Sequence, residues 1–191
     1  MDELDLGRTL LAIARRTIGA QLGLATASDS RHAALAQPAA TFVTLKQSGE
    51  LRGCIGSLKP IRPLGVDVRE NAIAAAFRDP RFPPLSVREY EVTSVEVSLL
   101  SADERIDVAT EADLVAQLRP GIDGLVLQHG VQRATFLPQV WETLPEPREF
   151  VAALKRKAGL PVDFWSPRMM VSRYGVTKWA ESEFAASEEE R

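Results

Sequence analysis

The amino-acid sequence predicts an α+β fold in which helices flank antiparallel strand hairpins. Residues 2–23 carry apolar side chains at the spacing of a helix with one buried face. Residues 41–57 and 125–137 each contain two strand-like segments around a short turn with glycine. Residues 92–100 alternate in the period of a strand with one face in a core. Together these patterns indicate a mixed fold.

The N-terminal helix and the first hairpin have clear boundaries. Asp2 is expected to cap the helix and Gly23 to end it. Strands are predicted at residues 41–46 and 51–57, rich in Val, Thr, Phe and Ile, around the turn Gln47-Ser48-Gly49-Glu50.

A second helix is predicted over residues 64–78, where Val68, Ala72 and Ala75 share one stripe. Asp79-Pro80 ends this helix, because proline restricts the residue before it and cannot extend the helix. A proline-rich loop, Arg81-Phe82-Pro83-Pro84, follows.

The second half of the chain again mixes helices and strands. The expected elements are a short helix at residues 111–118, strands at 125–128 and 132–137, a helix at 149–158 and a strand within 169–179. Residues 181–191 contain five glutamates and few large apolar side chains, so they predict a frayed acidic tail outside the core.

A short internal similarity relates the two hairpins. With one gap, residues 45–55 align with residues 127–136, and each hairpin is followed by a proline and then a helix. An old duplication of a strand-strand-helix unit would leave this pattern, with Arg52 and Arg133 in equivalent places. A chance match is the alternative.

Composition excludes several classes of protein. The 191 residues are 45% hydrophobic and 26% charged, which is the balance of a globular protein. The net charge of -3 lacks the basic footprint of a general nucleic-acid binder. The acidic start Met1-Asp2-Glu3 does not resemble a signal peptide, and the longest apolar run, residues 72–77, is far too short to span a membrane. One cysteine, Cys54, fits a reducing compartment, so a cytoplasmic protein is expected.

The most unusual segment is Arg52-Gly53-Cys54-Ile55-Gly56, because a strand interior rarely holds two glycines without a bulge or a close approach. In an extended chain, Arg52 and Cys54 point to the same face. A guanidinium near a thiol favours the reactive thiolate, and Gly53 would leave their surroundings open. The alternative is that Cys54 is a small buried apolar residue and Arg52 a surface charge.

A second candidate is the stiff loop at residues 79–85, where prolines limit the directions of Asp79 and Arg81. The loop is expected to lie against residues 52–56 and to line a shared pocket, or else to be a simple helix stop. Glu96 is either solvated or a carboxylate partner for Arg52. His32 and His129 fall in an expected loop and an expected turn, so neither is the favoured catalytic base.

Five ordered motifs resemble the signature segments of the AMMECR family, whose bacterial and archaeal members are called AmmeMemoRadiSam system protein A. The motifs are Leu51-Arg52-Gly53-Cys54-Ile55-Gly56, Phe77-Arg78-Asp79-Pro80-Arg81-Phe82-Pro83-Pro84-Leu85, Gly121-Ile122-Asp123-Gly124-Leu125, Thr135-Phe136-Leu137-Pro138-Gln139-Val140 and Lys157-Ala158-Gly159-Leu160. The likeness covers residues 7–180.

The resemblance implies a mainly antiparallel sheet flanked by helices, in two unequal lobes. It implies one domain of this type over residues 1–180, within which a smaller lobe around residues 58–105 is allowed, and a separate tail at 181–191. It also implies a gene neighbourhood with a Memo-like protein and a radical S-adenosylmethionine protein, which are therefore the expected partners. No cofactor is named by the resemblance, and no metal site is expected.

Two functions from different classes remain open. In the first, the protein is an enzyme or enzyme subunit with Cys54 as nucleophile, redox thiol or transient metal ligand. Arg52, Asp79 and Arg81 then bind or close the pocket, and Gly53 and Gly56 shape it. In the second, the protein is a non-catalytic module, with an anion-recognising surface formed by a set of arginines: Arg52, Arg81 and Arg133.

Overall fold

The computed structural model describes residues 3–24 and 31–184, which form two compact units. Among these residues, the larger unit takes the chain up to Leu100 and again from Thr177, and the smaller unit spans Ser101–Val176. The smaller unit is therefore an insertion between two strands of the larger one. The sequence allowed a smaller lobe around residues 58–105. Most of that segment, residues 58–100, belongs to the larger unit.

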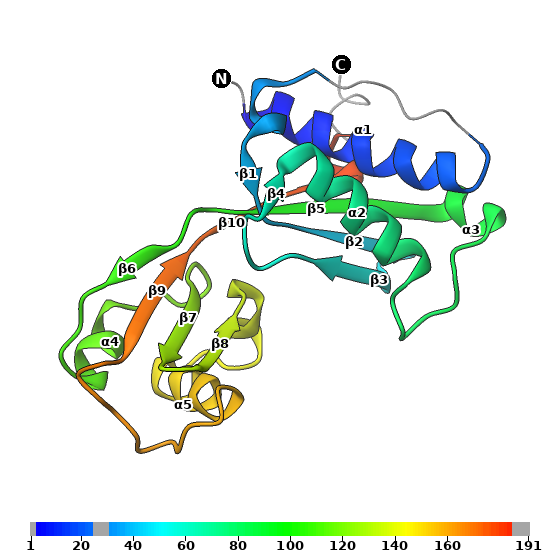
Figure 1. The fold of residues 1–191 in the computed structure, drawn as a ribbon. Coiled ribbons are helices and arrows are strands. Elements are labelled where there is room, and N and C mark those ends of the chain that lie inside the picture. The colour runs from blue at the N-terminus through cyan, green and yellow to red at the C-terminus, as the bar shows by residue number, and fades with distance from the viewer. Residues whose placement is uncertain (1–2, 25–30, 185–191) are drawn as a thin grey trace. The chain divides into compact units, whose positions relative to one another are not determined.

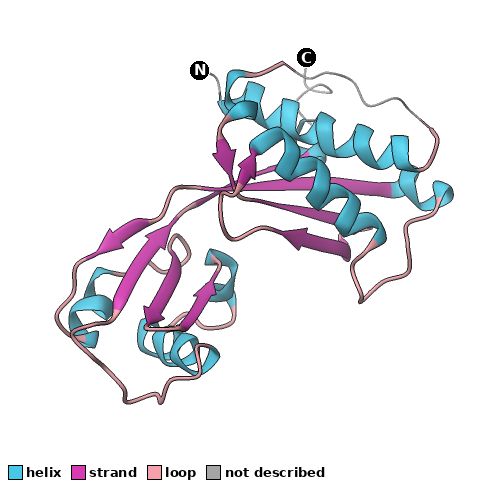
Figure 2. Ribbon diagram, in the orientation of Figure 1, coloured by secondary structure: helices cyan, strands magenta, loops and turns pink. Residues whose placement is uncertain are grey.

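The larger unit contains a four-stranded antiparallel sheet in the order β10-β5-β2-β3 and a small β1-β4 pair (Figures 1 and 2). Its elements are α1 (Glu3–Gln21), η1 (Ala33–Ala36), β1 (Pro38–Ala39), β2 (Thr41–Gln47), β3 (Glu50–Gly56), β4 (Arg62–Pro63), α2 (Leu64–Phe77), α3 (Val87–Val92), β5 (Thr93–Leu100) and β10 (Val176–Ala180). The first predicted hairpin is confirmed, and β3 is the edge strand of the sheet.

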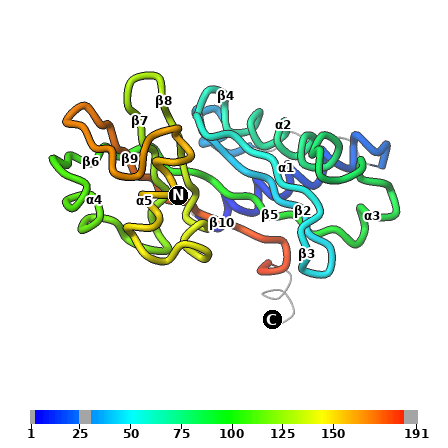
Figure 3. The backbone as a smooth tube through the Cα atoms, turned by 90° about the horizontal axis from the view of Figure 1, so that it is seen from below, coloured from blue at the N-terminus to red at the C-terminus, as the bar shows by residue number. Residues whose placement is uncertain are grey.

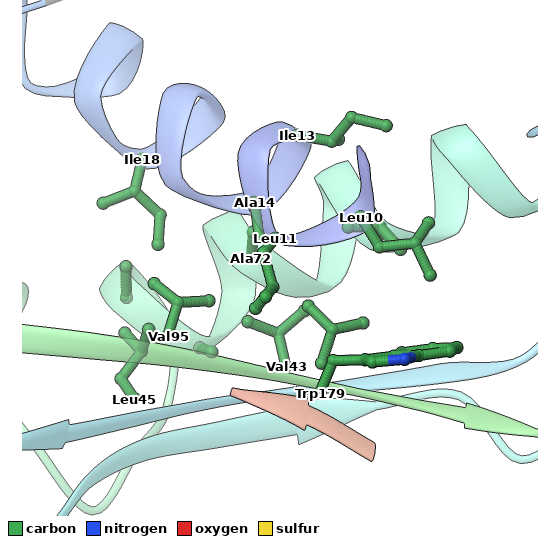
Figure 4. Close-up of a cluster of buried hydrophobic side chains, with 14 of the residues drawn as sticks. Leu10, Leu11, Ile13, Ala14, Ile18, Val43, Leu45, Ala72, Val95 and Trp179 are labelled. Carbon is green, nitrogen blue, oxygen red and sulfur yellow. The ribbon is translucent and has the colours of Figure 1, made fainter. Parts of the chain in front are cut away.

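Helices α1 and α2 cover the same face of this sheet (Figures 1 and 4). Val43, Leu45 and Val95 are fully buried and point toward the helices, as the alternation along β2 and β5 predicts. Trp179 on β10 packs against α1 at Gly7, where an added Cβ would lie 2.4 Å from the indole ring. The close approach of the indole therefore requires glycine at this helical position.

A buried carboxylate joins the ends of three elements on the helical side. Asp67 is fully buried, and its Oδ2 accepts hydrogen bonds from the Thr41 backbone N–H (2.9 Å), the Thr41 hydroxyl (2.7 Å) and the Asn71 amide (2.9 Å). Its Oδ1 accepts from the Ser57 hydroxyl at 2.8 Å and from the Arg62 guanidinium at 2.7 Å. These bonds tie the start of β2 and the end of β3 to α2.

The smaller unit contains a second four-stranded antiparallel sheet, in the order β6-β9-β7-β8. Its elements are β6 (Glu104–Ile106), α4 (Glu111–Gln117), β7 (Gly124–His129), β8 (Gln132–Phe136), η2 (Pro138–Glu142), α5 (Pro147–Lys157) and β9 (Met170–Tyr174). Strands β7 and β8 lie side by side (Figure 3), so the second predicted hairpin is also confirmed. Lys155 of α5 is fully buried, and its ammonium donates to Glu111 Oε2 at 2.6 Å and to the backbone oxygen of Val162.

Both units place a hairpin at the sheet edge, then a helix, then a strand beside the first hairpin strand. In the larger unit these are β2, β3, α2 and β5, and in the smaller unit they are β7, β8, α5 and β9. The common order is the arrangement that the proposed duplication predicts. The duplication itself stays a hypothesis.

The C-terminal part of the chain differs from its expectation. The single strand expected within residues 169–179 is two strands, β9 and β10, which belong to different sheets. Glu181 is not frayed: its carboxylate accepts from the Arg15 guanidinium at 2.8 Å and from the Val95 backbone N–H at 2.8 Å. The rest of the predicted tail, residues 185–191, and the expected cap at Asp2 lie outside the described residues.

None of the helices in residues 3–24 and 31–184 is both long enough and apolar enough to cross a bilayer.

Replacement of Asp67 by Asn should lower the free energy of unfolding by about 2 to 4 kcal/mol, because it breaks a buried, charged hydrogen-bond network. Glu70→Gln is the control, since Glu70 is exposed on the same helix. Urea titration of both variants measures the effect. Equal midpoints for the two variants would contradict the structural role given to Asp67.

Candidate functional site

Strand β3 carries the Arg52 to Gly56 segment at the open edge of the larger unit's sheet. Gly53 faces α2, and a Cβ there would lie 2.3 Å from the backbone oxygen of Ala75. A Cβ at Gly56 would lie 2.2 Å from the Phe42 ring. The expectation that Gly53 leaves open space beside the thiol is therefore wrong: both glycines allow close packing by a neighbouring group.

The loop at residues 79–85 lies against β3, as expected. Oδ2 of Asp79 accepts a hydrogen bond from the Cys54 backbone N–H at 2.9 Å. The Arg81 guanidinium donates to the Cys54 backbone oxygen at 3.1 Å and to Asp79 Oδ2 at 2.6 Å. These two side chains therefore occupy the donor and acceptor positions that a further strand would use at Cys54.

Arg52 holds the far end of the same loop. Its Nε donates to Glu89 Oε1 and its Nη2 to the Pro83 backbone oxygen, both at 2.9 Å. The residue is only 7% exposed, and its Nη1 is buried without a hydrogen bond. The suggested pair with Glu96 is wrong, because α3 brings Glu89 to this position through a capping box with Ser86.

The carboxylates of Asp79 in the loop and Glu89 in α3 are strongly stabilised as anions. The hydrogen bond from Arg81 is the largest cause that holds the pKa of Asp79 far below its usual range. The hydrogen bond from Arg52 is the largest cause that lowers the pKa of Glu89 from 4.5 to about 2. Each arginine is therefore already paired with an internal anion at neutral pH.

Cys54 is half-buried and its thiol faces away from the helices. The Thr44 hydroxyl donates to Cys54 Sγ at 3.3 Å. Thr44 is paired with Cys54 on one side and with Glu96 of β5 on the other, so the three side chains form one row across the sheet. Glu96 pairs with Lys46 at 2.8 Å and with Lys178 at 3.8 Å.

The remaining candidates lie elsewhere. Arg133 is on β8 of the smaller unit, opposite Gln128, and is absent from the hydrogen bonds that define this site. Of the two histidines, His32 accepts from the Ala34 backbone N–H, and His129 packs its ring on Phe164 at 5.0 Å. Within the described ranges, no three His, Cys, Asp or Glu side chains are grouped so that they could hold a metal ion.

Two hydrogen-bond partners were missed from the sequence: Glu89, which pairs with Arg52, and Thr44, which pairs with Cys54. Ser86 and Glu89 have the spacing of a capping box, which marks the start of α3 but not the partner of Arg52. Thr44 could have been found by pairing the hairpin around its turn, although the bulge between Leu45 and Lys46 shifts the register on the turn side.

Comparisons with known proteins agree over nearly the whole chain. A family model described as AMMECR1 matches residues 11–179. A protein of Methanothermobacter thermautotrophicus is 40% identical over 179 residues, which cover 89% of this chain and 91% of that protein. A protein of Thermofilum pendens is 34% identical over 177 residues, with 83% and 81% covered.

One solved structure has the same fold. It is the crystal structure of an uncharacterized protein from Pyrococcus horikoshii, with a TM-score of 0.75 and 33% sequence identity. The match covers 92% of this chain and 91% of that one. The names of these relatives state no activity, so the chemistry has to come from the residues of the site.

Arg52→Met should lower the free energy of unfolding by about 1 to 3 kcal/mol, because Glu89 loses a charged donor and Pro83 loses its partner. Arg88→Met, at an exposed arginine of α3, should change it by no more than about 0.5 kcal/mol. Denaturant unfolding compares the two. A silent Arg52→Met would show that the guanidinium does not fasten the loop.

Stability should also depend on pH through Glu89. Its folded-state pKa, about 2, lies below the ordinary 4.5, so its contribution is complete above pH 5 and is lost as the pH falls toward 2. The stability difference between wild type and Glu89→Gln should therefore shrink between pH 6 and pH 3. Urea midpoints at a series of pH values measure this, and a constant difference would refute the assigned ion pair.

Proposed function

The chain belongs to the AMMECR1 family, and from that premise we propose that it is an enzyme or enzyme subunit in which the Cys54 thiol is the reacting group. The observation that supports this proposal most directly is the hydrogen bond from the Thr44 hydroxyl to Cys54 Sγ at 3.3 Å. A donor on sulfur stabilises the thiolate, which is the nucleophilic form. Cys54 is also half-exposed, so a reactant can approach it.

The surrounding residues support this proposal as positioning groups. Asp79 and Arg81 hold the backbone of Cys54 from both its N–H and its carbonyl. Arg52 fixes the loop that carries them, and Gly53 and Gly56 permit the close packing that keeps β3 in place. A reacting atom held on a rigid strand loses little entropy when it reaches the geometry of attack.

The proposed chemistry requires a second component. A lone thiol cannot form an internal disulfide, and neither described histidine contacts the sulfur. A general base, a second thiol or a shared metal would therefore come from a substrate or a partner protein. We propose the Memo-like and radical S-adenosylmethionine proteins of the family's gene neighbourhood as these partners, in the cytoplasm, where a single cysteine stays reduced.

A non-catalytic binding module is the second candidate, favoured by the same lack of a base beside Cys54. In the larger unit its anion surface would rest on Arg81, whose side chain is 53% exposed, because Arg52 is buried and paired with Glu89. Arg133 belongs to the smaller unit, so the two arginines are not assigned to one surface. Cys54→Ala separates the candidates. If the protein is a binding module, Cys54→Ala should change neither its affinity for a Memo-like partner nor the activity of that partner. If the protein is a thiol enzyme, Cys54→Ala should abolish the activity and leave the affinity unchanged.

The experiment for the proposed function is alkylation of native Cys54 by iodoacetamide. Thr44→Val should slow alkylation at neutral pH about three- to ten-fold, because the thiolate loses a hydrogen bond. Thr177→Val, on β10 of the same sheet, is the control and should react like wild type. A wild-type Cys54 that reacts only after unfolding would reject the reacting thiol and leave a packing role.

A further inference from the structure

The two long helices described in the larger unit, α1 and α2, leave the second face of its sheet uncovered. Helices α1 and α2 both lie on the opposite face, where Val43, Leu45 and Val95 point (Figures 1 and 4). Residues at the alternate positions of the same strands therefore face away from the core. They include the row Cys54, Thr44 and Glu96 on three adjacent strands.

The charged end of this row has surplus hydrogen-bond donors. Glu96 is only 14% exposed, and its carboxylate forms ion pairs with Lys46 at 2.8 Å and with Lys178 at 3.8 Å. The two lysine side chains are 33% and 51% exposed. Each ammonium carries three N–H donors, so most of these donors remain available to a ligand. Two cations flank one carboxylate that is less exposed than they are, so the accessible charge is positive.

The spacing of the row sets the size of a matching ligand. Neighbouring strands are about 4.8 Å apart, so Glu96 on β5 lies about 10 Å and Lys178 on β10 about 14 Å across the sheet from Cys54 on β3. Lys46 is on β2 and reaches toward Glu96. Thr44 lies between Glu96 and the thiol, and the Phe42 ring covers Gly56 beside Cys54 on the same face. The path from the cations to the sulfur therefore crosses a small hydroxyl side chain with an apolar ring next to it.

We infer that the face of this sheet opposite to α1 and α2 binds an anionic small molecule. The anionic group of the ligand would lie on Lys46 and Lys178, and the rest of the ligand would extend across Thr44 to Cys54. The inference rests on the proposed function of Cys54 and adds the charge and length of the substrate. Charge complementarity supports it, because the two lysines carry one more positive charge than Glu96 balances.

A pair of labels of equal length tests the inference. The acid 6-maleimidohexanoate carries a carboxylate about two strand spacings from its double bond, and 6-maleimidohexanamide is its neutral analogue. In each reaction the Cys54 thiolate adds to the double bond and the adjacent ring carbon takes a proton from water. Wild type should react with the acid about five-fold faster or more at low salt, and less so as salt rises.

Variants identify the source of this preference. Lys46→Met and Lys178→Met should each reduce this preference, and Glu96→Gln should raise it. Lys59→Met, at an exposed lysine between β3 and β4, should leave it unchanged. Circular dichroism confirms that each variant is folded. Equal rates for the two labels, or a preference that survives both lysine substitutions, would overturn the anion site while Cys54 stays reactive. A Cys54 that reacts with neither label would instead reject the proposed function.

Discussion

An edge strand leaves one row of backbone donors and acceptors without a neighbour, and in this protein the side chains of Asp79 and Arg81 take that place beside β3. The carboxylate accepts from the Cys54 N–H, the guanidinium donates to the Cys54 carbonyl, and the two groups pair with each other. Unsatisfied edges otherwise invite pairing with other chains. The same contacts fix the backbone of β3 at Cys54, so protection of the edge and the position of this residue have a common cause.

The internal pairing of charges decides which groups remain for chemistry. Arg52 and Arg81 are bound to Glu89 and Asp79, and the low pKa of both carboxylates keeps these pairs ionised at neutral pH. Arg52 and Arg81 therefore serve mainly to hold the loop at residues 79–85 against β3. On the face of the sheet opposite to α1 and α2, the exposed donors are those of Lys46 on β2 and Lys178 on β10, which flank Glu96.

Local patterns in the sequence predicted α1, α2, α4 and α5, both hairpins and the position of the 79–85 loop against β3, but they missed α3. They failed where the outcome depends on contacts distant in sequence. Glu89 is 37 residues from Arg52, and only the turn into α3 brings the two together. The strand expected across residues 169–179 divides between two sheets, because each half pairs with strands far away in the chain. The two glycines of β3 correctly indicated a bulge or a close approach. The groups that approach them, Ala75 and Phe42, could not be identified from sequence spacing alone.

Amide hydrogen exchange at Cys54 tests the central claim most directly, because that N–H has a side chain, rather than a strand, as its acceptor. In the wild type, the Cys54 amide should be protected to a degree similar to that of Ile55, whose partner in β2 is Val43. In Asp79→Ala, protection should be lost at Cys54 and kept at Ile55. A Cys54 amide that exchanges freely in the wild type, or that keeps its protection without Asp79, would contradict the account.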